Sequence, residues 1–246
     1  MPVALIAKLE RFTRLSRQDK AVLAQLASER VRKVGPHQDI IREGEAPVEI
    51  NLFLSGWAYR HKHLEDGRRQ IIAFFLPGDL CDHNIFILRE MDHSVSTITP
   101  VTVAGVTREI FDALTLNHPR IIQALWWESL VTCAIQREWT VSLGQRSATE
   151  RMAHLLCELF LRLQAVGLTE GNSCDFPVTQ ADLADATGLS PVHVNRTLQE
   201  LRALGVVELR SKTLSIPDLP ALMRASMFNA SYLHLGHEGN HLDANE

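Results

Sequence analysis

The chain has 246 residues, of which 46% are hydrophobic and 22% are charged, as in ordinary soluble globular proteins. Its longest uninterrupted apolar run, Ile71 to Leu76, is far shorter than the about 20 residues that a membrane helix needs. The N-terminus lacks the apolar core of a signal peptide, so we expect a cytoplasmic protein with no membrane partner. The formal net charge of −4 excludes a chain that is basic as a whole, so any nucleic-acid contact must rest on a local basic patch.

Residue types that bind metals or carry out catalysis do not occur in recognisable patterns. The four cysteines lie far apart and include no C-x-x-C pair, which argues against a disulfide scaffold, a zinc site or an iron–sulfur cluster of ordinary spacing. There is no G-x-S-x-G, H-E-x-x-H or phosphate loop. We therefore expect no metal, no catalytic residue, no identifiable cofactor and no enzymatic activity.

The N-terminal half predicts short helices followed by many short strands. Residues 3–30 are predicted to be helical, with Ser16 as the N-cap of the second helix. Between residues 31 and 107, short apolar stretches alternate with breaks rich in glycine and proline, a texture typical of a sandwich or barrel. Asp66-Gly67 between two such stretches predicts a hairpin. We expect an α+β protein that begins with an antiparallel β-barrel of cupin or jelly-roll type over residues 1–118.

A long helix is predicted over residues 119–145. Pro119 suits a first helical turn, and Ile121 to Leu143 is apolar around most of its circumference. A helix of this kind is buried on several sides, so it is predicted to pack on the barrel with one face and on a partner subunit with another. The alternative is a helix buried within a monomer. A further helix is predicted from Thr149 to about Val166, and residues 167–177 are predicted to be loop.

Residues 178–201 contain the most informative pattern. Thr179 with Asp182 forms a capping box, Gly188 permits a sharp turn, and Ser190 caps a second helix with Pro191 in its first position. Two short helices joined in this way, the second polar at its start, are typical of a helix-turn-helix whose second helix enters the major groove. An ordinary helical hairpin is the alternative.

The residues that follow predict a wing. Residues 206–209 and 213–216 read as two strands, with basic side chains at the turn that suit phosphate contacts. We expect a winged helix-turn-helix over residues 146–222 and a C-terminal tail over residues 223–246 that is poorly ordered after Ala225. The candidate DNA-contacting residues are Thr179, Gln180, Ser190, Val192, His193, Asn195, Arg196, Gln199, Arg210 and Lys212.

A barrel, a long helix and a winged helix-turn-helix in this order resemble the CRP/FNR family of bacterial transcription regulators. The resemblance covers about residues 10–220. It implies a homodimer that binds a two-fold symmetric DNA operator with half-sites about 34 Å apart. It further implies an effector between barrel and long helix, and RNA polymerase as a further partner. Its strongest marks outside the helix-turn-helix are Gly44-Glu45, Gly56, Phe75-Leu76-Pro77-Gly78-Asp79 and Arg151-Met152-Ala153.

The effector region departs from the members that bind cyclic AMP. Those members hold the ribose with a Gly-Glu pair and the phosphate with an Arg-Ser pair, where this chain has Asp82-His83 and His93-Ser94. A neutral imidazole replaces a phosphate-binding guanidinium poorly, and Asp82 adds negative charge. The sequence therefore argues against cyclic AMP, although Arg89 lies near enough to compensate. The residues of the tentative effector pocket are Asp82, His83, Arg89, His93, Ser94, Trp126, Gln136, Arg137 and Trp139.

Two other departures concern cofactors and the operator. The first cysteine is Cys81, so the N-terminal cluster of the oxygen-sensing members is missing; haem bound by histidine or cysteine in the sensory region remains an alternative. In the recognition helix, Arg196 matches the family's base-reading arginine, but Val192 stands where members that read the well-known half-sites have Glu. Since valine suits a thymine methyl and not cytosine N4, the operator should differ at that base pair.

The sequence thus predicts a homodimeric regulator whose barrel senses a small molecule of unknown identity and controls operator binding. The alternative is a DNA-binding regulator without an effector, in which the barrel is a dimer scaffold. A cysteine redox switch at Cys81 or Cys133 is a third hypothesis.

Overall fold

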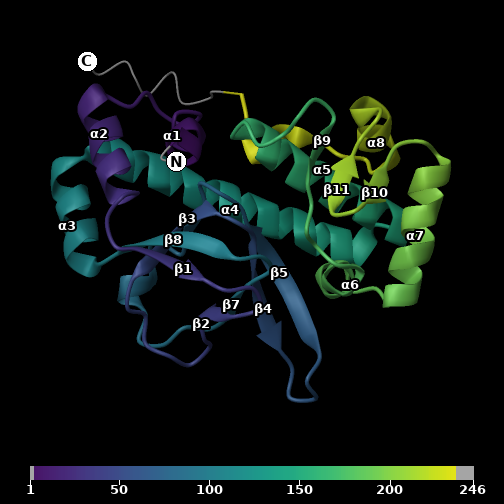
Figure 1. The fold of residues 1–246 in the computed structure, drawn as a ribbon, viewed down its shortest axis with the longest axis horizontal. Coiled ribbons are helices and arrows are strands. Elements are labelled where there is room, and N and C mark those ends of the chain that lie inside the picture. The colour runs from purple at the N-terminus through teal and green to yellow at the C-terminus, as the bar shows by residue number, and fades with distance from the viewer. Residues whose placement is uncertain (1–2, 237–246) are drawn as a thin grey trace. The chain divides into compact units, whose positions relative to one another are not determined.

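A computed structural model describes residues 3–236 (Figure 1). The chain divides into two compact units, which are described separately. The first unit comprises the chain up to residue 62, residues 73–133 and the end of the described chain from residue 234; the second comprises residues 63–72 and 134–233. Strand β5 (Arg69–Phe75) and helix α4 (Pro119–Gln145) contribute residues to both units. None of the helices within residues 3–236 is long and apolar enough to cross a membrane.

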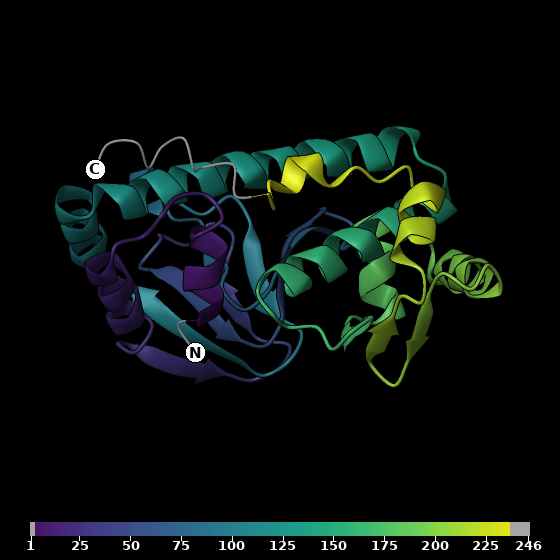
Figure 2. The same cartoon turned by 90° about the horizontal axis from the view of Figure 1, so that it is seen from above.

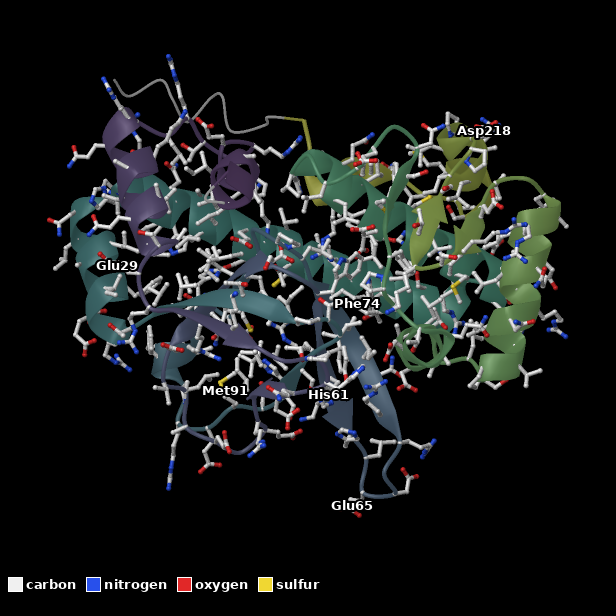
Figure 3. All side chains as sticks on the ribbon, in the orientation of Figure 1. Glu29, His61, Glu65, Phe74, Met91 and Asp218 are labelled. Carbon is white, nitrogen blue, oxygen red and sulfur yellow. The ribbon has the colours of Figure 1, made fainter. Side chains whose placement is uncertain are left out.

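Two four-stranded antiparallel sheets form the predicted N-terminal barrel. Their strand orders are β1-β8-β3-β6 and β2-β7-β4-β5. Aromatic side chains fill the core: the rings of Phe53 and Phe75 stack at 5.1 Å, and Trp57 meets Phe74, labelled in Figure 3, edge-on. The fold class is as the sequence predicts. The strands are β1 (Val31–Val34), β2 (Asp39–Ile41), β3 (Ile50–Ser55), β4 (Ala58–His63), β5, β6 (Leu80–Cys81), β7 (Ser94–Thr97) and β8 (Val101–Val106), with a 3-10 turn, η1, at Ile85–Ile87.

One glycine of the barrel is required by geometry. Gly56, between β3 and β4, has a φ of +84°, and a Cβ built there would lie 2.4 Å from the carbonyl oxygen of Pro100. A backbone atom cannot move aside cheaply, so only glycine fits this turn. The turn brings β4 back beside β7, where Tyr59 lies opposite Ser96.

Three helices accompany the barrel in the first unit. The predicted cap is confirmed: the Ser16 hydroxyl accepts from the backbone N–H of Asp19, and the Asp19 carboxylate accepts from that of Ser16. Lys8 forms ion pairs with Asp79, at 2.7 Å, and with Glu128 of α4. These contacts tie the N-terminal helix to the barrel and to the first half of α4. The helices are α1 (Val3–Leu9), α2 (Arg17–Leu26) and α3 (Arg108–Asn117).

The second unit contains the predicted helices and one strand that the sequence did not predict. Residues 167–177 were expected to be loop, but β9 pairs with β11, with Cys174 opposite Leu214. A strand of three residues with two polar side chains gives no alternating pattern, so only its partner reveals it. Figure 2 shows these strands beside the helices of the unit. The elements are α5 (Ala148–Ala165), β9 (Ser173–Asp175), α6 (Gln180–Thr187), α7 (Pro191–Ala203), β10 (Glu208–Arg210), β11 (Thr213–Ser215), α8 (Leu219–Ala225) and a 3-10 turn, η2 (Ala230–Leu233).

The expectation of a poorly ordered tail after Ala225 is wrong for residues 226–236, which the structure describes. Asp218, labelled in Figure 3, caps α8, and Leu222 is fully buried. Phe228 and Tyr232 place their rings 4.7 and 5.9 Å from that of His154 on α5. Buried apolar side chains, not polar composition, decide the structure of this segment; residues 237–246 lie outside the described chain.

Candidate functional site

Helices α6 and α7 form the helix-turn-helix with the local geometry that the sequence predicts (Figure 1). The Thr179 hydroxyl accepts from the backbone N–H of Asp182, whose carboxylate accepts in return from Thr179. Gly188 ends α6 in the left-handed region, with φ +65°. The Ser190 hydroxyl then accepts from the N–H of His193 at 3.3 Å. Thr179 and Ser190 therefore act as helix caps, and their helix N-termini suit an anion such as a DNA phosphate.

One face of α7 is buried and the opposite face is free. Val194, Leu198 and Leu201 are buried against the rest of the unit. On the free face Val192 is 82% exposed, an unusual environment for a large apolar side chain. The other exposed side chains of this face, at spacings of three and four residues, are Asn195, Arg196 and Gln199.

The guanidinium of Arg196 is positioned by its own helix. Its Nη2 lies 2.9 Å from the Nε2 of His193, which accepts the hydrogen bond, and its Nε lies 3.7 Å from the Glu200 carboxylate. Glu200 in turn accepts from the Thr149 hydroxyl at 2.7 Å. The Arg196 side chain remains two-thirds exposed, so its donors are available to an external acceptor.

The wing is a two-residue hairpin. Ser211 and Lys212 both have positive φ, +49° and +63°, as the turn between two short, twisted strands requires. Arg202 of α7 donates to the carbonyl of Leu209, which ties the wing to the recognition helix. Lys212 is exposed, and Arg210 is partly neutralised by Glu208 at 2.9 Å. The predicted basic tip therefore presents Lys212 to solvent and holds Arg210 in an ion pair.

Two arginines brace α6 within the second unit. Arg69 reaches the carboxylates of Asp182 at 2.8 Å and Asp185 at 2.7 Å. Arg151 donates to the carbonyl of Thr187, the last residue of α6, at 2.6 Å, and also to the carbonyl of Ser142 at 2.8 Å. Arg69 thus holds α6 through two carboxylates, and Arg151 holds the end of α6 through a backbone carbonyl. The helix-turn-helix is therefore fixed within its unit.

A buried polar cluster lies under α5. Burial and the nearby charge of Arg146 lower the pKa of His154 to about 3, so its imidazole is neutral. Burial raises the pKa of Glu158, against the charge of Arg162 and the hydrogen bonds that it accepts. Its donors are the Tyr232 hydroxyl at 2.9 Å and the Trp139 indole at 3.1 Å. The cluster joins η2 to α4 and α5.

Part of α4 is apolar and exposed. Trp126 and Leu130 are 65% and 63% exposed, and Cys133 and Val141 continue on the outward side. Positions 126, 130 and 133 follow the four-and-three spacing of a coiled-coil seam. We call Trp126, Leu130, Cys133, Arg137 and Val141 the α4 stripe.

A second charged cluster lies in the barrel. Arg60 of β4 forms an ion pair with Asp82, which also accepts from His93 at 2.9 Å and from the Cys81 thiol at 3.0 Å. The second ring nitrogen of His93 lies 2.6 Å from Asp92. The ring of Phe75 lies under the Arg60 guanidinium at 5.1 Å. Asp82 is therefore surrounded by donors.

Residues 31–118 match the cyclic nucleotide-binding domain, and residues 150–225 match the Crp-like helix-turn-helix domain. The transcriptional activator protein FnrL of Cereibacter sphaeroides is 29% identical over 206 residues, 81% of this chain and 80% of that protein. The solved structure of FixK2 from Bradyrhizobium japonicum superposes with a TM-score of 0.72 at 23% identity, over 81% of this chain and 98% of that one.

One relative decides the family. The nitrogen fixation regulation protein FixK of Bradyrhizobium diazoefficiens is 30% identical over 188 residues, which are 76% of this chain and 78% of that protein. The chain belongs to the CRP/FNR family of transcription regulators. As a CRP/FNR regulator it has a DNA-binding helix-turn-helix and a domain like those that bind cyclic nucleotides. The relatives are regulators and not enzymes, in agreement with the sequence prediction.

The predicted effector residues of this CRP/FNR protein lie in several environments. Asp82 and His93 are in contact, the ring of His83 bonds to the Ser129 hydroxyl at 2.7 Å, and the Ser94 hydroxyl accepts from the backbone of Glu43. The side chain of Arg89 is 95% exposed and meets Glu90 at 3.8 Å. Of the predicted residues on α4, Trp126 and Arg137 are exposed, Gln136 donates to the carbonyl of Ile72, and Trp139 is buried against Glu158.

Several residues that organise these sites have no signal in the sequence. Arg60 lies 22 positions from Asp82, and Arg69 lies 113 positions from Asp182. Pairs so distant leave no local pattern, so only the folded chain brings them together. Ser147 and Glu150 are different, since their capping box at the start of α5 has the S-x-x-E spacing and could have been read from the sequence.

Proposed function

We propose that the chain is a homodimeric, sequence-specific DNA-binding regulator that acts in the cytoplasm, on promoters read by RNA polymerase. In this proposal residues 1–118 are the effector-type barrel, 119–145 the dimerisation helix and 146–222 the DNA-binding domain. The observation that carries it is the free face of α7, where Val192, Asn195, Arg196 and Gln199 project from a helix with a buried opposite face.

The chemistry of this face supports direct base reading. An arginine presented at the start of a recognition helix suits the O6 and N7 atoms of guanine, and an asparagine suits adenine. Val192, exposed and apolar, supports contact with a thymine methyl at the neighbouring base pair. Lys212 on the wing and the N-terminus of α6 at Thr179 and Gln180 suit phosphates, which set register and not sequence. His193 takes part by positioning Arg196.

The α4 stripe supports the homodimer. Large exposed apolar side chains in one row are rarely left in water, and the spacing of Trp126, Leu130 and Cys133 fits the seam between two helices. A second copy of the same helix is the natural occupant, because a two-fold operator requires a two-fold protein. We therefore assign the α4 stripe, which includes Arg137, to the contact with the partner subunit.

The barrel argues against cyclic AMP as the effector. Asp82 places a carboxylate beside Arg60 and His93, and a bound phosphate would meet its negative charge. An effector of another chemical class, sensed by the barrel, is the first candidate. The second candidate, favoured by the same ion pair, is a regulator that needs no effector and uses the barrel as a scaffold.

Selection from a randomised DNA pool tests this function. The full-length protein is incubated with the pool with and without cyclic AMP, at one stated salt concentration because phosphate contacts make affinity salt-dependent. We expect a two-fold symmetric site with half-sites about one helical turn apart, selected equally in both conditions.

The other outcomes contradict parts of the proposal. A site selected only with cyclic AMP would overturn the interpretation of Asp82. Failure to select any site, in a sample that is folded and dimeric, would contradict the second candidate, a regulator that binds its operator without an effector.

A further inference from the structure

Three groups from separate segments of the barrel meet at one carboxylate. Arg60 projects from β4, Asp82 follows β6 and His93 precedes β7. The side chains of Arg60 and His93 are only 11% and 9% exposed, and both donate to Asp82. A buried charge in a protein is normally paired, and here the carboxylate of Asp82 accepts from both side chains.

The backbone of Asp82 is held in an unfavourable conformation to make these contacts. Its φ is +51°, in the left-handed region that residues with a Cβ seldom adopt. Such strain persists only where the surroundings over-determine it, and it gathers at functional sites. The contacts at the carboxylate supply that constraint, so the position of the negative charge is fixed by the fold.

The guanidinium of Arg60 has a donor that Asp82 does not use. The Nε of Arg60 is buried and has no hydrogen-bond partner among the described residues. The guanidinium lies over the ring of Phe75 at 5.1 Å from the ring centroid. A planar guanidinium fork and an imidazole that face one point form a typical oxyanion site, since a phosphate group offers more acceptor oxygens than one carboxylate.

Asp82 is ionised in this environment. Burial alone would raise the pKa of Asp82, but the hydrogen bond from His93 and the charge of Arg60 outweigh it and hold that pKa well below its usual value. The carboxylate is thus a permanent anion at any physiological pH.

We propose that Arg60 and His93 form a site for a phosphate-type oxyanion within the barrel. The carboxylate of Asp82, an anion that belongs to the chain itself, occupies this site. While Asp82 is present, its negative charge excludes free phosphate and phosphate esters. This inference deepens the second candidate above, the regulator that needs no effector. It concerns the barrel alone, so it can fail while the proposal of DNA binding stands, and the reverse.

Chemical rescue tests the proposal in the full-length protein. In Asp82→Gly the glycine adopts the left-handed φ without strain and leaves Arg60 and His93 without their anion. The midpoint of thermal unfolding is measured for this variant and the unsubstituted protein in sodium phosphate, with sodium chloride keeping the ionic strength constant. We expect phosphate to raise the midpoint of the variant by about 2–4 °C and to leave the unsubstituted protein unchanged.

Two control variants make the test specific. Asp82→Gly combined with Arg60→Gln should lose the response to phosphate, because the guanidinium fork is gone. Asp92→Asn changes the other, solvent-exposed carboxylate on His93 and should behave like the unsubstituted protein.

Three outcomes would overturn the proposal: no effect of phosphate on Asp82→Gly, an equal effect on the double variant, or an Arg60-dependent effect on the unsubstituted protein. Should Asp82→Gly not fold, Asp82→Asn removes the charge and keeps the shape. A rise in its midpoint with phosphate supports the proposal, and its absence contradicts it.

Discussion

Arg69 lies 2.8 Å from the carboxylate of Asp182, which also completes the capping box of α6. A residue of strand β5 thus contacts the N-terminal turn of the first helix of the helix-turn-helix, and its Nε also reaches Asp185 at 2.7 Å. Within the second unit, α6 is therefore held by a residue that lies outside residues 146–222, the segment proposed to bind DNA.

Arg69→Gln should therefore destabilise the second unit. The pair is mostly buried, with 22% and 10% of the two side chains exposed, so the expected loss lies between those of surface and buried pairs, about 1–3 kcal/mol. Urea unfolding followed by circular dichroism measures it. Arg68→Gln, next along the chain but exposed and paired with Asp66, is the control and should cost under about 0.5 kcal/mol. Equal effects of the two substitutions would show that the ion pairs of Arg69 with Asp182 and Asp185 contribute nothing to the stability of the second unit.

Substitution of Arg196 should separate base reading from general attraction to DNA. Arg196→Gln is expected to weaken binding to the selected operator by about 1–3 kcal/mol while changing binding to random DNA little. Lys212→Gln is the matched comparison: because it removes a cation that is proposed to contact a phosphate, it should weaken binding to both DNAs and reduce the salt slope by about 1. Fluorescence anisotropy over a series of salt concentrations gives both quantities. Parallel losses on operator and random DNA for Arg196→Gln would make Arg196 a phosphate-binding residue.

A charge on the α4 stripe should prevent dimerisation. Leu130→Glu places a carboxylate in the expected helix–helix seam, where it would be desolvated without a partner. Sedimentation velocity at micromolar concentration should then give a monomer, whereas the proposed function predicts a dimer for the unsubstituted protein. Leu116→Glu on α3 is the control, since Leu116 is equally apolar and 82% exposed but lies off the stripe. A dimer that survives Leu130→Glu would place the interface elsewhere.

The buried imidazole of His154 should make the second unit sensitive to acid. Because its pKa is about 3 in the folded chain and about 6.5 when unfolded, protonation favours the unfolded state. The neutral imidazole contributes fully to the free energy of unfolding above about pH 6.5. This contribution is lost as the pH falls toward 3, by up to roughly 4–5 kcal/mol. His154→Phe keeps the ring contacts with Phe228 and should flatten the dependence of unfolding free energy on pH in this window. His37→Asn, at an exposed position, should not; the same slope in both variants would assign the acid sensitivity to other groups.

Local chemistry explains which features could be predicted from the sequence. The caps at Thr179 and Ser190, the left-handed Gly188 and the long helix from Pro119 all follow from residues within a few positions of one another. Such interactions are formed by neighbours along the chain, so their spacing in the sequence is their spacing in space. Together with the short apolar stretches and glycine- and proline-rich breaks of residues 31–107, these interactions were enough to predict a barrel, a long helix and a helix-turn-helix in this order.

Tertiary structure decided the rest. The pairing of Arg60 with Asp82, the brace from Arg69 to Asp182 and the third strand of the wing sheet join segments that no periodicity links. Each depends on loop closure and on burial in the finished fold, where a buried charge must find whichever partner the fold brings within reach. The sequence by itself determined that α7 is the second helix of a helix-turn-helix, whereas only the folded barrel decided that the buried guanidinium of Arg60 is paired with Asp82.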